Sequence, residues 1–295
     1  MRSATPVITI GMPAYNASAT LRESIESILA QHSADLELVI SDNASTDDTW
    51  QIIDEYRRLD SRIVAFRQTE NIGANGNYSA VFRAARGRYF KWASSNDWCA
   101  PQLVAECMDA LERRTDAVLA APGTRLFTLA PSDAVDYEGD VAFDDADPVT
   151  RFTRVMQELK LNNLINGVMR TAALSRTRLI QHYPGADNVL LAHLSLLGPI
   201  LVLPGRHFYR RMDAATATRL MSAEAVHRHH YPRRTARALF PNWRFEAGLI
   251  RAVLSSRLPP RGVTRGLAWI SRNAYWNRSN LLYDLVQALR YPLRD

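Results

Sequence analysis

The run VITIGMPAYN, residues 7–16, joins an apolar segment to a turn of proline and small polar side chains. Its first part, Val7 to Met12, is apolar apart from Thr9 and Gly11, which is typical of a strand buried on both faces. We expect Pro13 to end this strand, because proline has no backbone N–H to donate. LELVIS, which begins at Leu36, has the same character and is followed by DNAST. Each strand is therefore followed directly by a polar loop.

Two helices are predicted around the second strand. Apolar residues recur at helical spacing over residues 18–31, and Ser18 is the expected N-cap of that helix. The same spacing recurs over residues 46–58, where Ser45 or Thr46 is the expected N-cap. The first helix connects the two strands, so the strands are expected to run parallel.

The alternation continues along the chain. We predict a strand from Ile63, a helix over residues 75–86 and a strand over residues 88–93. Strands that alternate with helices of this length predict an α/β fold with a mainly parallel sheet. In such a sheet, ligands bind at the carboxyl ends of the strands. PAYN, SDNAST and SSND follow three of these strands, so their polar side chains are expected to gather at one edge.

The overall composition indicates a globular protein in a reducing compartment. Hydrophobic residues make up 47% of the 295 residues, and the only cysteines are Cys99 and Cys107, which cannot build a disulfide framework. The first residues lack the pattern of a signal peptide, and no apolar run reaches the roughly 18–20 residues of a membrane helix. These features predict a cytoplasmic protein.

Charge is distributed unevenly along the chain. Residues 206–295 hold 17 arginines, no lysine and 5 acidic residues, which gives +12, whereas residues 1–205 hold 19 basic and 25 acidic residues, which gives −6. A basic segment on an acidic body indicates either an anionic partner, such as anionic lipid, or helix faces that are simply solvated.

Seven short segments, taken in order, resemble family 2 glycosyltransferases of the GT-A fold. The segments are PAYN (13–16), SDNASTDDT (41–49), ENIGANGNY (70–78), ARGRYFKW (85–92), NDWCAP (96–101), GADNVLLAHLSLLG (185–198) and FYRRMD (208–213). No segment is diagnostic alone, but the ordered series across roughly residues 6–213 is specific. The resemblance implies a Rossmann-like, mainly parallel sheet with flanking helices, followed here by a helical, arginine-rich C-terminal extension.

The resemblance also implies which residues hold a nucleotide-sugar donor. Asp42 would accept a hydrogen bond from a pyrimidine N–H, and its alternative role is to cap the turn before the second helix. The helix that begins near Gly73 would offer its N-terminus to the diphosphate. Arg83 and Arg86 on this helix are interpreted as surface charges. The donor-binding residues implied in this way are Pro13, Ala14, Tyr15, Asn16, Asp42, Asn71, Asn77, Ser94, Ser95, Asn96, Asp97 and Arg211.

The metal-binding signature of the family is altered in this chain. Most members carry a DxD-type motif where this chain has SSND, so Asn96 replaces a carboxylate and Asp97 remains. A histidine near the metal in the family corresponds to Asp213, and we hypothesise that Asp213 restores the missing negative charge. A neutral amide ligand should weaken a divalent cation, Mn²⁺ or Mg²⁺. Arg211 is the first candidate to neutralise the diphosphate in its place.

Asp187 is the residue for which the resemblance implies catalysis. In the family, an acidic residue just before the LLAxLxLLG helix serves as general base, and Asp187 stands just before LLAHLSLLG. An inverting transfer needs one carboxylate that removes the proton of the acceptor hydroxyl during attack on the anomeric carbon. The alternative role of Asp187 is to be the N-cap of its helix.

We expect two regions in the chain. Residues 1–221 would form the GT-A domain, with a nucleotide-binding half at 1–100 and an acceptor half at 101–221. Residues 222–295 would form a helical region in which tryptophans and tyrosines lie beside arginines. That composition suits packing on the catalytic domain, a homodimer or peripheral contact with the inner membrane face, and no nucleic-acid partner is expected.

The sequence therefore predicts an inverting glycosyltransferase of polysaccharide biosynthesis. It would move a sugar from a nucleotide-sugar to a hydroxyl of a glycan, lipid-linked or natural-product acceptor. UDP is favoured because Asp42 suits a pyrimidine, and dTDP and GDP stay open. The altered SSND motif motivates an alternative, which is a weak or inactive relative that binds a nucleotide-sugar or a protein.

Overall fold

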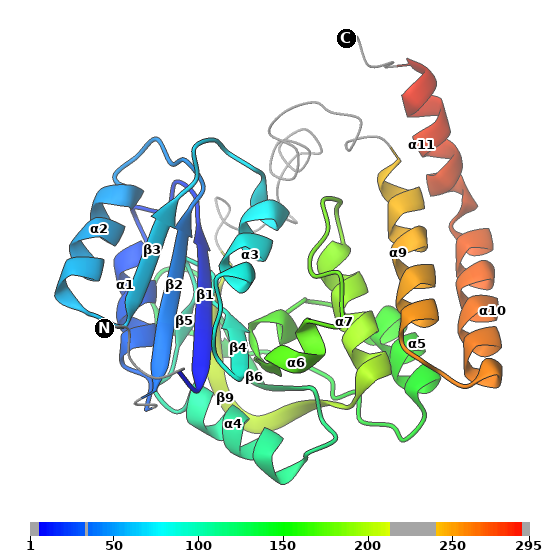
Figure 1. Ribbon diagram of the computed structural model, residues 1–295, viewed down its shortest axis with the longest axis horizontal. Helices are drawn as coiled ribbons and strands as arrows, with labels where there is room; N and C mark the ends of the chain where they lie inside the picture. The colour runs from blue at the N-terminus through cyan, green and yellow to red at the C-terminus, as the bar shows by residue number, and fades with distance from the viewer. Residues whose placement is uncertain (1–5, 33–34, 213–239, 291–295) are drawn as a thin grey trace.

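The computed structural model of the chain describes residues 6–32, 35–212 and 240–290. In these residues nine strands form one sheet, in the order β3-β2-β1-β4-β8-β6-β9-β5, with β7 paired to β6 beside this path. The first strands of the chain lie at one end of the sheet, and the helices nearest the C-terminus lie at the far side of the molecule (Figure 1).

The predicted alternation in the first third of the chain is confirmed. β1 pairs in parallel with β2 and with β4, and β2 pairs in parallel with β3. The carboxyl ends of these strands therefore lie at one edge. The elements are β1 (Ile8–Ala14), α1 (Leu21–Leu29), β2 (Leu36–Asp42), α2 (Thr49–Leu59), β3 (Ile63–Arg67), α3 (Ala74–Arg83) and β4 (Tyr89–Trp92).

The prediction that Pro13 ends the first strand is wrong. β1 continues to Ala14, which lies beside Asp42 of β2. The ladder with β4 stops at Gly11, whose carbonyl accepts from Ala93 N. Residues 11 and 13 direct their backbone groups to the same side of β1, toward β4. The ladder has already ended there, so the missing N–H of Pro13 costs no hydrogen bond.

The predicted N-caps of the first two helices are also wrong. The N-cap of α1 is Thr20 and that of α2 is Asp48, and neither makes a side-chain capping bond. The side chain of Ser45, one of the expected caps, accepts a hydrogen bond from Asn16 N instead. Tertiary contacts between the two loops have replaced local capping.

The second half of the chain completes the sheet. β8 pairs antiparallel with β4 and with β6, and β9 pairs in parallel with β6. The short β5 pairs antiparallel with β9. This pairing brings the end of β9 to the edge of the sheet where β4 ends. The elements are β5 (Trp98–Cys99), α4 (Leu103–Arg113), β6 (Leu119–Phe127), η1 (Pro131–Asp133), β7 (Val135–Asp136), α5 (Pro148–Glu158), η2 (Leu164–Asn166), β8 (Val168–Arg170), α6 (Thr171–Leu174), α7 (Ala186–Leu197) and β9 (Ile200–Arg211).

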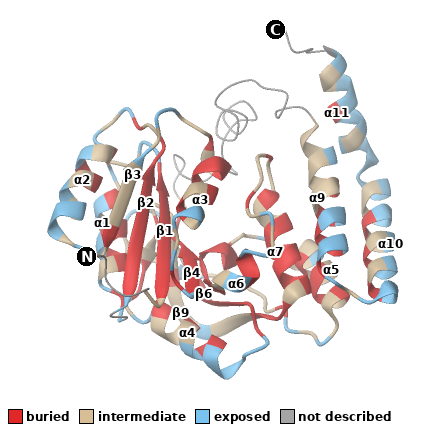
Figure 2. Cartoon of the chain, in the orientation of Figure 1, coloured by how far each residue is buried: buried red, intermediate tan, exposed pale blue. Residues whose placement is uncertain are grey.

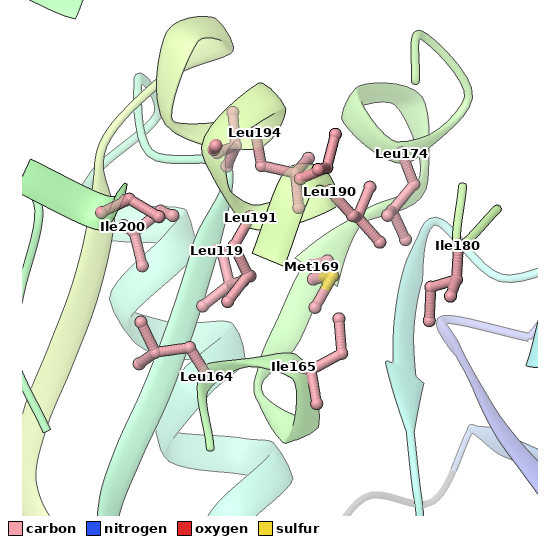
Figure 3. Packing of buried hydrophobic residues seen from close by; sticks show 14 of the residues in the cluster. Leu119, Leu164, Ile165, Met169, Leu174, Ile180, Leu190, Leu191, Leu194 and Ile200 are labelled. Carbon is pink, nitrogen blue, oxygen red and sulfur yellow. The ribbon is translucent and has the colours of Figure 1, made fainter. Parts of the chain in front are cut away.

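Two hydrophobic clusters lie on the two faces of the sheet. One cluster packs α1, α2 and α4 against strand residues such as Ile10 and Leu38. The other packs α3, α5, α6 and α7 against strand residues such as Leu119 and Met169, and it continues into the C-terminal helices. Figure 3 shows this second cluster, in which Leu190 and other residues of α7 meet side chains of the sheet. Burial on both faces explains why the strands read as continuous apolar runs.

Three helices form the described part of the C-terminal region, α9 (Pro241–Ser255), α10 (Pro260–Trp276) and α11 (Arg278–Arg290). Trp269 of α10 contacts Phe152 of α5 edge to face, with 5.6 Å between ring centroids. α11 packs on α9 and leaves Leu282, Tyr283 and Leu289 exposed (Figure 2). None of the helices in the described ranges combines the length and the hydrophobicity of a membrane span. The expected boundary between residues 221 and 222 lies outside the described residues.

Candidate active site

The loops after β1 and β2 are joined by side-chain hydrogen bonds. Asn16 Oδ1 accepts from Thr46 N at 2.9 Å, and Asn16 N donates to Ser45 Oγ at 3.0 Å. Asp47 accepts from Ser18 N and from Thr49 N, both at 3.1 Å. Burial raises the pKa of Asp47, but the hydrogen bonds from Thr49 and Ser18 lower it overall to about 2. Asn16 holds φ 46°, a left-handed conformation that asparagine tolerates. The two polar loops therefore form one rigid rim.

Asp42 lies at the end of β2 and is fully buried, with one carboxylate oxygen hydrogen-bonded and the other in an ion pair. Its Oδ1 accepts from Ser45 N at 3.2 Å, so the turn-capping role is present. Its Oδ2 lies 2.9 Å from Arg67 Nε in an ion pair. The alignment of that pair is too poor for a hydrogen bond, and within the described ranges no other donor reaches this buried oxygen. A buried acceptor without a donor is costly, so it suits a ligand N–H.

Asn77 is a buried clamp that fixes the ends of β1 and β2. Its Oδ1 accepts from Ser41 Oγ at 2.6 Å, and its Nδ2 donates to the carbonyls of Ser41 at 2.9 Å and Ala14 at 3.3 Å. Its amide is therefore engaged by the protein itself. The predicted donor contact of Asn77 stays a prediction, and its position beneath the rim is structural.

The N-terminus of α3 faces the same edge. The helix begins after Gly73, whose φ of 77° is a left-handed conformation open mainly to glycine. Asn71 Oδ1 accepts from Gly73 N at 2.9 Å and from Asn43 Nδ2 at 2.9 Å. Asn71 thus closes the turn before the helix and ties it to the loop after β2.

The SSND loop after β4 is held between α1 and β9. Asp97 is buried, and its Oδ1 accepts from Arg211 N at 2.9 Å. Burial raises the pKa of Asp97, while the charges of Arg210 and Lys91 act in the opposite direction. The backbone carbonyl of Ser95 accepts from Thr20 Oγ1 at 2.9 Å. The loop therefore presents one carboxyl group in a cationic setting.

Arg211 belongs to the framework and does not face the rim freely. Its Nη2 lies 2.6 Å from Glu23 Oε2, and its Nε donates to Asn96 O at 3.0 Å. Its Nη1 donates to the carbonyls of Thr128 and Leu129. Four of its donor contacts are thus made inside the protein, and the role of Arg211 in neutralising a diphosphate stays a prediction.

Arg210, its neighbour on β9, points the other way. Its Nη1 donates to Asn163 Oδ1 at 2.8 Å, and its charge acts on Asp97. The Nδ2 of Asn163 in turn donates a hydrogen bond to Asp140 Oδ1 at 2.9 Å. Alternation along a strand sends consecutive side chains to opposite faces, which explains why only one of the two arginines reaches the site.

Asp187 lies in the first turn of α7 and is half-buried. The N-cap is Gly185, with φ 77°, so the alternative that Asp187 is the N-cap is wrong. Asp187 Oδ2 accepts from Asn162 Nδ2 at 2.5 Å, and the same amide reaches Asn188 Oδ1 at 3.1 Å. The carboxylate is therefore held in place while it keeps access to solvent.

Tyr78 connects the rim to Asp187. Its side chain interacts with that of Ser94, and the charges of Asp97, Asp187 and Arg210 all act on its hydroxyl. Burial is the main reason that its pKa is raised. The electrostatic environment of this one hydroxyl therefore includes the SSND loop, the carboxylate of α7 and the arginine of β9.

The described donor set offers little to a divalent cation. Asp97 supplies one buried carboxyl group that already accepts a backbone N–H, and Asn96 supplies a neutral amide. Within the described residues, no group of three or more histidine, cysteine or acidic side chains could hold a metal ion. Asp213, the third predicted ligand, lies outside those residues. These two side chains alone do not fit a strong Mg²⁺ or Mn²⁺ site.

Sequence reasoning missed four residues of this arrangement, Arg67, Tyr78, Asn162 and Asn163. Tyr78 lies inside the quoted ENIGANGNY segment, and its place one residue beyond Asn77 is a signal that could have been used. Asn162 and Asn163 stand in LKLNNLING, which carries no periodic or motif signal. Only the packing of this segment against α7 and β9 gives these amides their roles.

Residues 9–128 match the family described as glycosyl transferase family 2. Over 92 residues, the chain is 36% identical to the UDP-Glc:alpha-D-GlcNAc-diphosphoundecaprenol beta-1,3-glucosyltransferase WfaP of Escherichia coli, covering 31% of this chain and 36% of that protein. Over 150 residues, it is 31% identical to the putative teichuronic acid biosynthesis glycosyltransferase TuaG of Bacillus subtilis, covering 48% of this chain and 57% of that protein. The chain thus spans between about a third and somewhat over half of these two relatives.

The fold is shared over nearly the whole chain. The crystal structure of S. aureus TarS 1-349 superposes with a TM-score of 0.64 at 15% identity, covering 95% of this chain and 80% of that one. TarS in complex with UDP-GlcNAc gives a TM-score of 0.63 at 15% identity, over 91% of this chain and 72% of that one. The mannosyltransferase PcManGT of Pyrobaculum calidifontis, in complex with GDP-Man and Mn²⁺, gives 0.55 at 15% identity, over 98% and 82%. The chain has the GT-A fold of these structures, and its residues 9–128 are similar to glycosyl transferase family 2.

Proposed function

We propose that the chain is an inverting glycosyltransferase that uses a nucleotide-sugar donor and a hydroxyl acceptor. The observation that carries this proposal is the gathering of polar loops and charged side chains at the carboxyl ends of the strands. The loops after β1 and β2 form one hydrogen-bonded rim, and the charges of Asp97 and Asp187 act on a single hydroxyl, that of Tyr78. An open α/β sheet binds its ligands at this edge.

The donor base is placed against Asp42. The buried Oδ2 of this residue, for which the described residues supply no hydrogen-bond donor, would accept the N–H of a uracil. Tyr15 is 46% exposed beside the rim and offers a ring face to the base. A UDP donor is favoured for this reason, and TarS, a structure with the same fold, has been solved with UDP-GlcNAc.

Asp187 acts as the general base in the proposed reaction. The proton of the acceptor hydroxyl passes to the Asp187 carboxylate as the acceptor oxygen forms a bond to the anomeric carbon. The bond from that carbon to the diphosphate oxygen breaks on the opposite face, so the configuration inverts. Asn162, which donates to Asp187 Oδ2 at 2.5 Å, orients the carboxylate and leaves its second oxygen for the hydroxyl.

Arg210 is the cation that we assign to the departing diphosphate. Its guanidinium is held by Asn163 and acts on Asp97, so it is positioned at the SSND loop. An arginine binds phosphate oxygens through two parallel N–H donors, which stabilises the charge that develops on the leaving group.

Thermal-shift screening against nucleotide-sugars tests the donor assignment. We expect pyrimidine nucleotide-sugars, UDP- or dTDP-linked, to raise the melting temperature more than GDP-sugars, and Asp42→Asn to reduce the shift. Transfer or donor hydrolysis measured with Mn²⁺ and with EDTA then separates an active enzyme from a binding module. Binding without turnover in either condition would support the alternative of an inactive relative, and the lack of any nucleotide-sugar binding would refute both.

A further inference from the structure

A second concave site lies away from the rim, between α3, α7 and α9. This cavity has a volume of about 610 Å³, within the roughly 300–1,000 Å³ range of small-molecule sites. We call it the α9 cavity. Its walls come from α3, the segment 177–183, α7 and α9. The described lining residues that carry or can carry charge are Arg83, Arg178, His182, Tyr183, His193, Arg244 and Arg251.

The α9 cavity is strongly cationic. Among its described lining residues there are four arginines and no acidic side chain. In the described part of the chain, no carboxylate pairs with Arg83, Arg178 or Arg251. By contrast Arg86, one turn beyond Arg83, is paired with Glu37 at 2.5 Å. A concave surface with charge of one sign focuses its field and attracts counter-ions.

Three of these arginines act on one buried group. The charges of Arg251, Arg178 and Arg244 all act on the Tyr183 hydroxyl, although burial dominates and raises its pKa to about 12. The arginine charges lower the pKa of this hydroxyl, whereas the negative charge of Asp187 raises it. Tyr183 and these three arginines line the same cavity.

The base of the cavity is polar but uncharged. His193 is 5% exposed, and its Nε2 lies 3.3 Å from Ser255 Oγ. Burial, with a smaller effect of Arg176, lowers the pKa of His193 to about 4, so the ring is neutral near pH 7. Neutral hydrogen-bond donors at the base of the α9 cavity and arginines around its opening are the groups that bind phosphate oxygens.

An apolar groove continues from the α9 cavity. It has a volume of about 510 Å³ and shares Arg244 and Arg251 with the cavity. Its other lining residues are Phe240, Trp243, Ala247 and Leu285, from α9, its N-terminal flank and α11. Trp243 is 46% exposed and Leu285 42% exposed, which is unusual for adjacent large apolar side chains. The two hollows together are cationic at one end and apolar at the other.

We propose that the α9 cavity and its groove form one binding site for a phosphate-bearing amphiphile. The phosphate or diphosphate group lies among Arg178, Arg244 and Arg251, and the hydrocarbon chain lies along Trp243 and Leu285. Charge complementarity and the two shared arginines favour this ligand over a purely apolar or purely ionic one. Its use as the acceptor site rests on the proposed function, whereas binding itself does not.

Isothermal titration of the full chain with farnesyl diphosphate, inorganic pyrophosphate and farnesol tests the proposal. We expect farnesyl diphosphate to bind about tenfold more tightly than pyrophosphate, because only it also buries apolar surface. The double variant R178Q/R251Q should weaken both diphosphates by about tenfold. The matched control R261Q/R272Q removes two exposed arginines of α10 and should change neither.

The groove is tested separately with Leu285→Ser. This variant should weaken farnesyl diphosphate and leave pyrophosphate unchanged, and Leu289→Ser, at an 83% exposed position of the same helix, is its control. Binding that is indifferent to R178Q/R251Q would overturn the proposal. Equal affinity for farnesyl diphosphate and pyrophosphate would overturn the assignment of an amphiphile and would indicate that the site binds a free oxyanion.

Two further arms identify the source of the phosphate and separate this proposal from the donor assignment. Sedimentation with phosphatidylglycerol vesicles that depends on Arg178 and Arg251 would support a bilayer headgroup, whereas binding of soluble farnesyl diphosphate without sedimentation would support an isoprenoid diphosphate. Nucleotide-sugar binding is measured on the same variants. Its absence from the unsubstituted chain, together with intact farnesyl diphosphate binding by that chain, would refute the proposed function alone.

Discussion

The rim at the strand ends and the α9 cavity handle polar side chains in opposite ways. At the rim, polar groups satisfy one another, as when Asn77 joins Ser41 and Ala14, or Asn16 joins Thr46. In the cavity, the described residues leave the charges of Arg178 and Arg251 without a carboxylate.

This difference separates a site that is already organised from one that still lacks a counter-ion. A preformed rim loses little conformational entropy on binding, so its affinity depends on a few placed acceptors such as Asp42 Oδ2. In the cavity, no described carboxylate pairs with Arg178 or Arg251, so an anion that enters would meet their positive charge. Substitutions at the rim should therefore damage folding or turnover, whereas substitutions in the cavity should mainly alter ligand binding.

The largest effect is expected at the junction of the two regions. Asp187→Asn removes the proposed base while it keeps the shape of the side chain, so turnover should fall by about 10²–10⁴-fold with donor binding preserved. Steady-state transfer and nucleotide-sugar titration measure the two quantities. Asp109→Asn, at an exposed position of α4, is the matched control. Normal turnover by Asp187→Asn would rule out the assignment.

A pH effect is expected from the buried histidine of the α9 cavity. The pKa of His193 is about 4 in the folded protein and about 6.5 in an unfolded chain. As the pH falls through this window, the unfolded state binds a proton that the folded state excludes, so stability decreases. The loss should approach about 3 kcal/mol below pH 4.

The measurement for His193 is denaturant unfolding at several pH values. Wild type and His193→Gln are compared, because acidic residues titrate near the lower end of the same window in both proteins. The variant should lose less stability between about pH 7 and pH 4. Parallel pH profiles for the two proteins would contradict the prediction.

A smaller loss of stability is expected from the rim clamp. Asn77→Ala leaves Ser41 and Ala14 without their buried partner, so the free energy of unfolding should fall by about 2 kcal/mol. Asn280→Ala, at an exposed position of α11, should change it by less than about 0.5 kcal/mol. Equal losses in the two variants would show that the rim is not preformed by this residue.

The smallest effect has the opposite sign. Without ligand, Arg251→Gln reduces repulsion among the cavity arginines, so it should stabilise the protein by about 0.5 kcal/mol at low salt. Arg272→Gln, an exposed arginine of α10, is the control. High salt should abolish the gain, because screening acts on exposed charges. Destabilisation at low salt would mean that Arg251 has a favourable contact and would weaken the contrast between the regions.

The sequence by itself determined the sheet and the edge where its polar loops gather. Val7 to Met12 and LELVIS are buried on both faces, and a continuous apolar run records that burial directly. Parallel pairing then brings PAYN, SDNAST and SSND together without further information. The residues of the rim were predictable because each lies within a few positions of a strand end.

The tertiary structure alone decided which side chains act at the site. Asn162 supports Asp187 across 25 positions of the chain, and Arg210 rather than Arg211 faces Asp97, since β9 alternates its side chains. The α9 cavity assembles arginines from α3, the segment 177–183 and α9. The spacing of apolar residues along the chain indicates whether a segment is a helix or a strand and which of its side chains are buried. Contacts between distant elements depend instead on how the packed helices orient their faces. That orientation exists only in the folded chain.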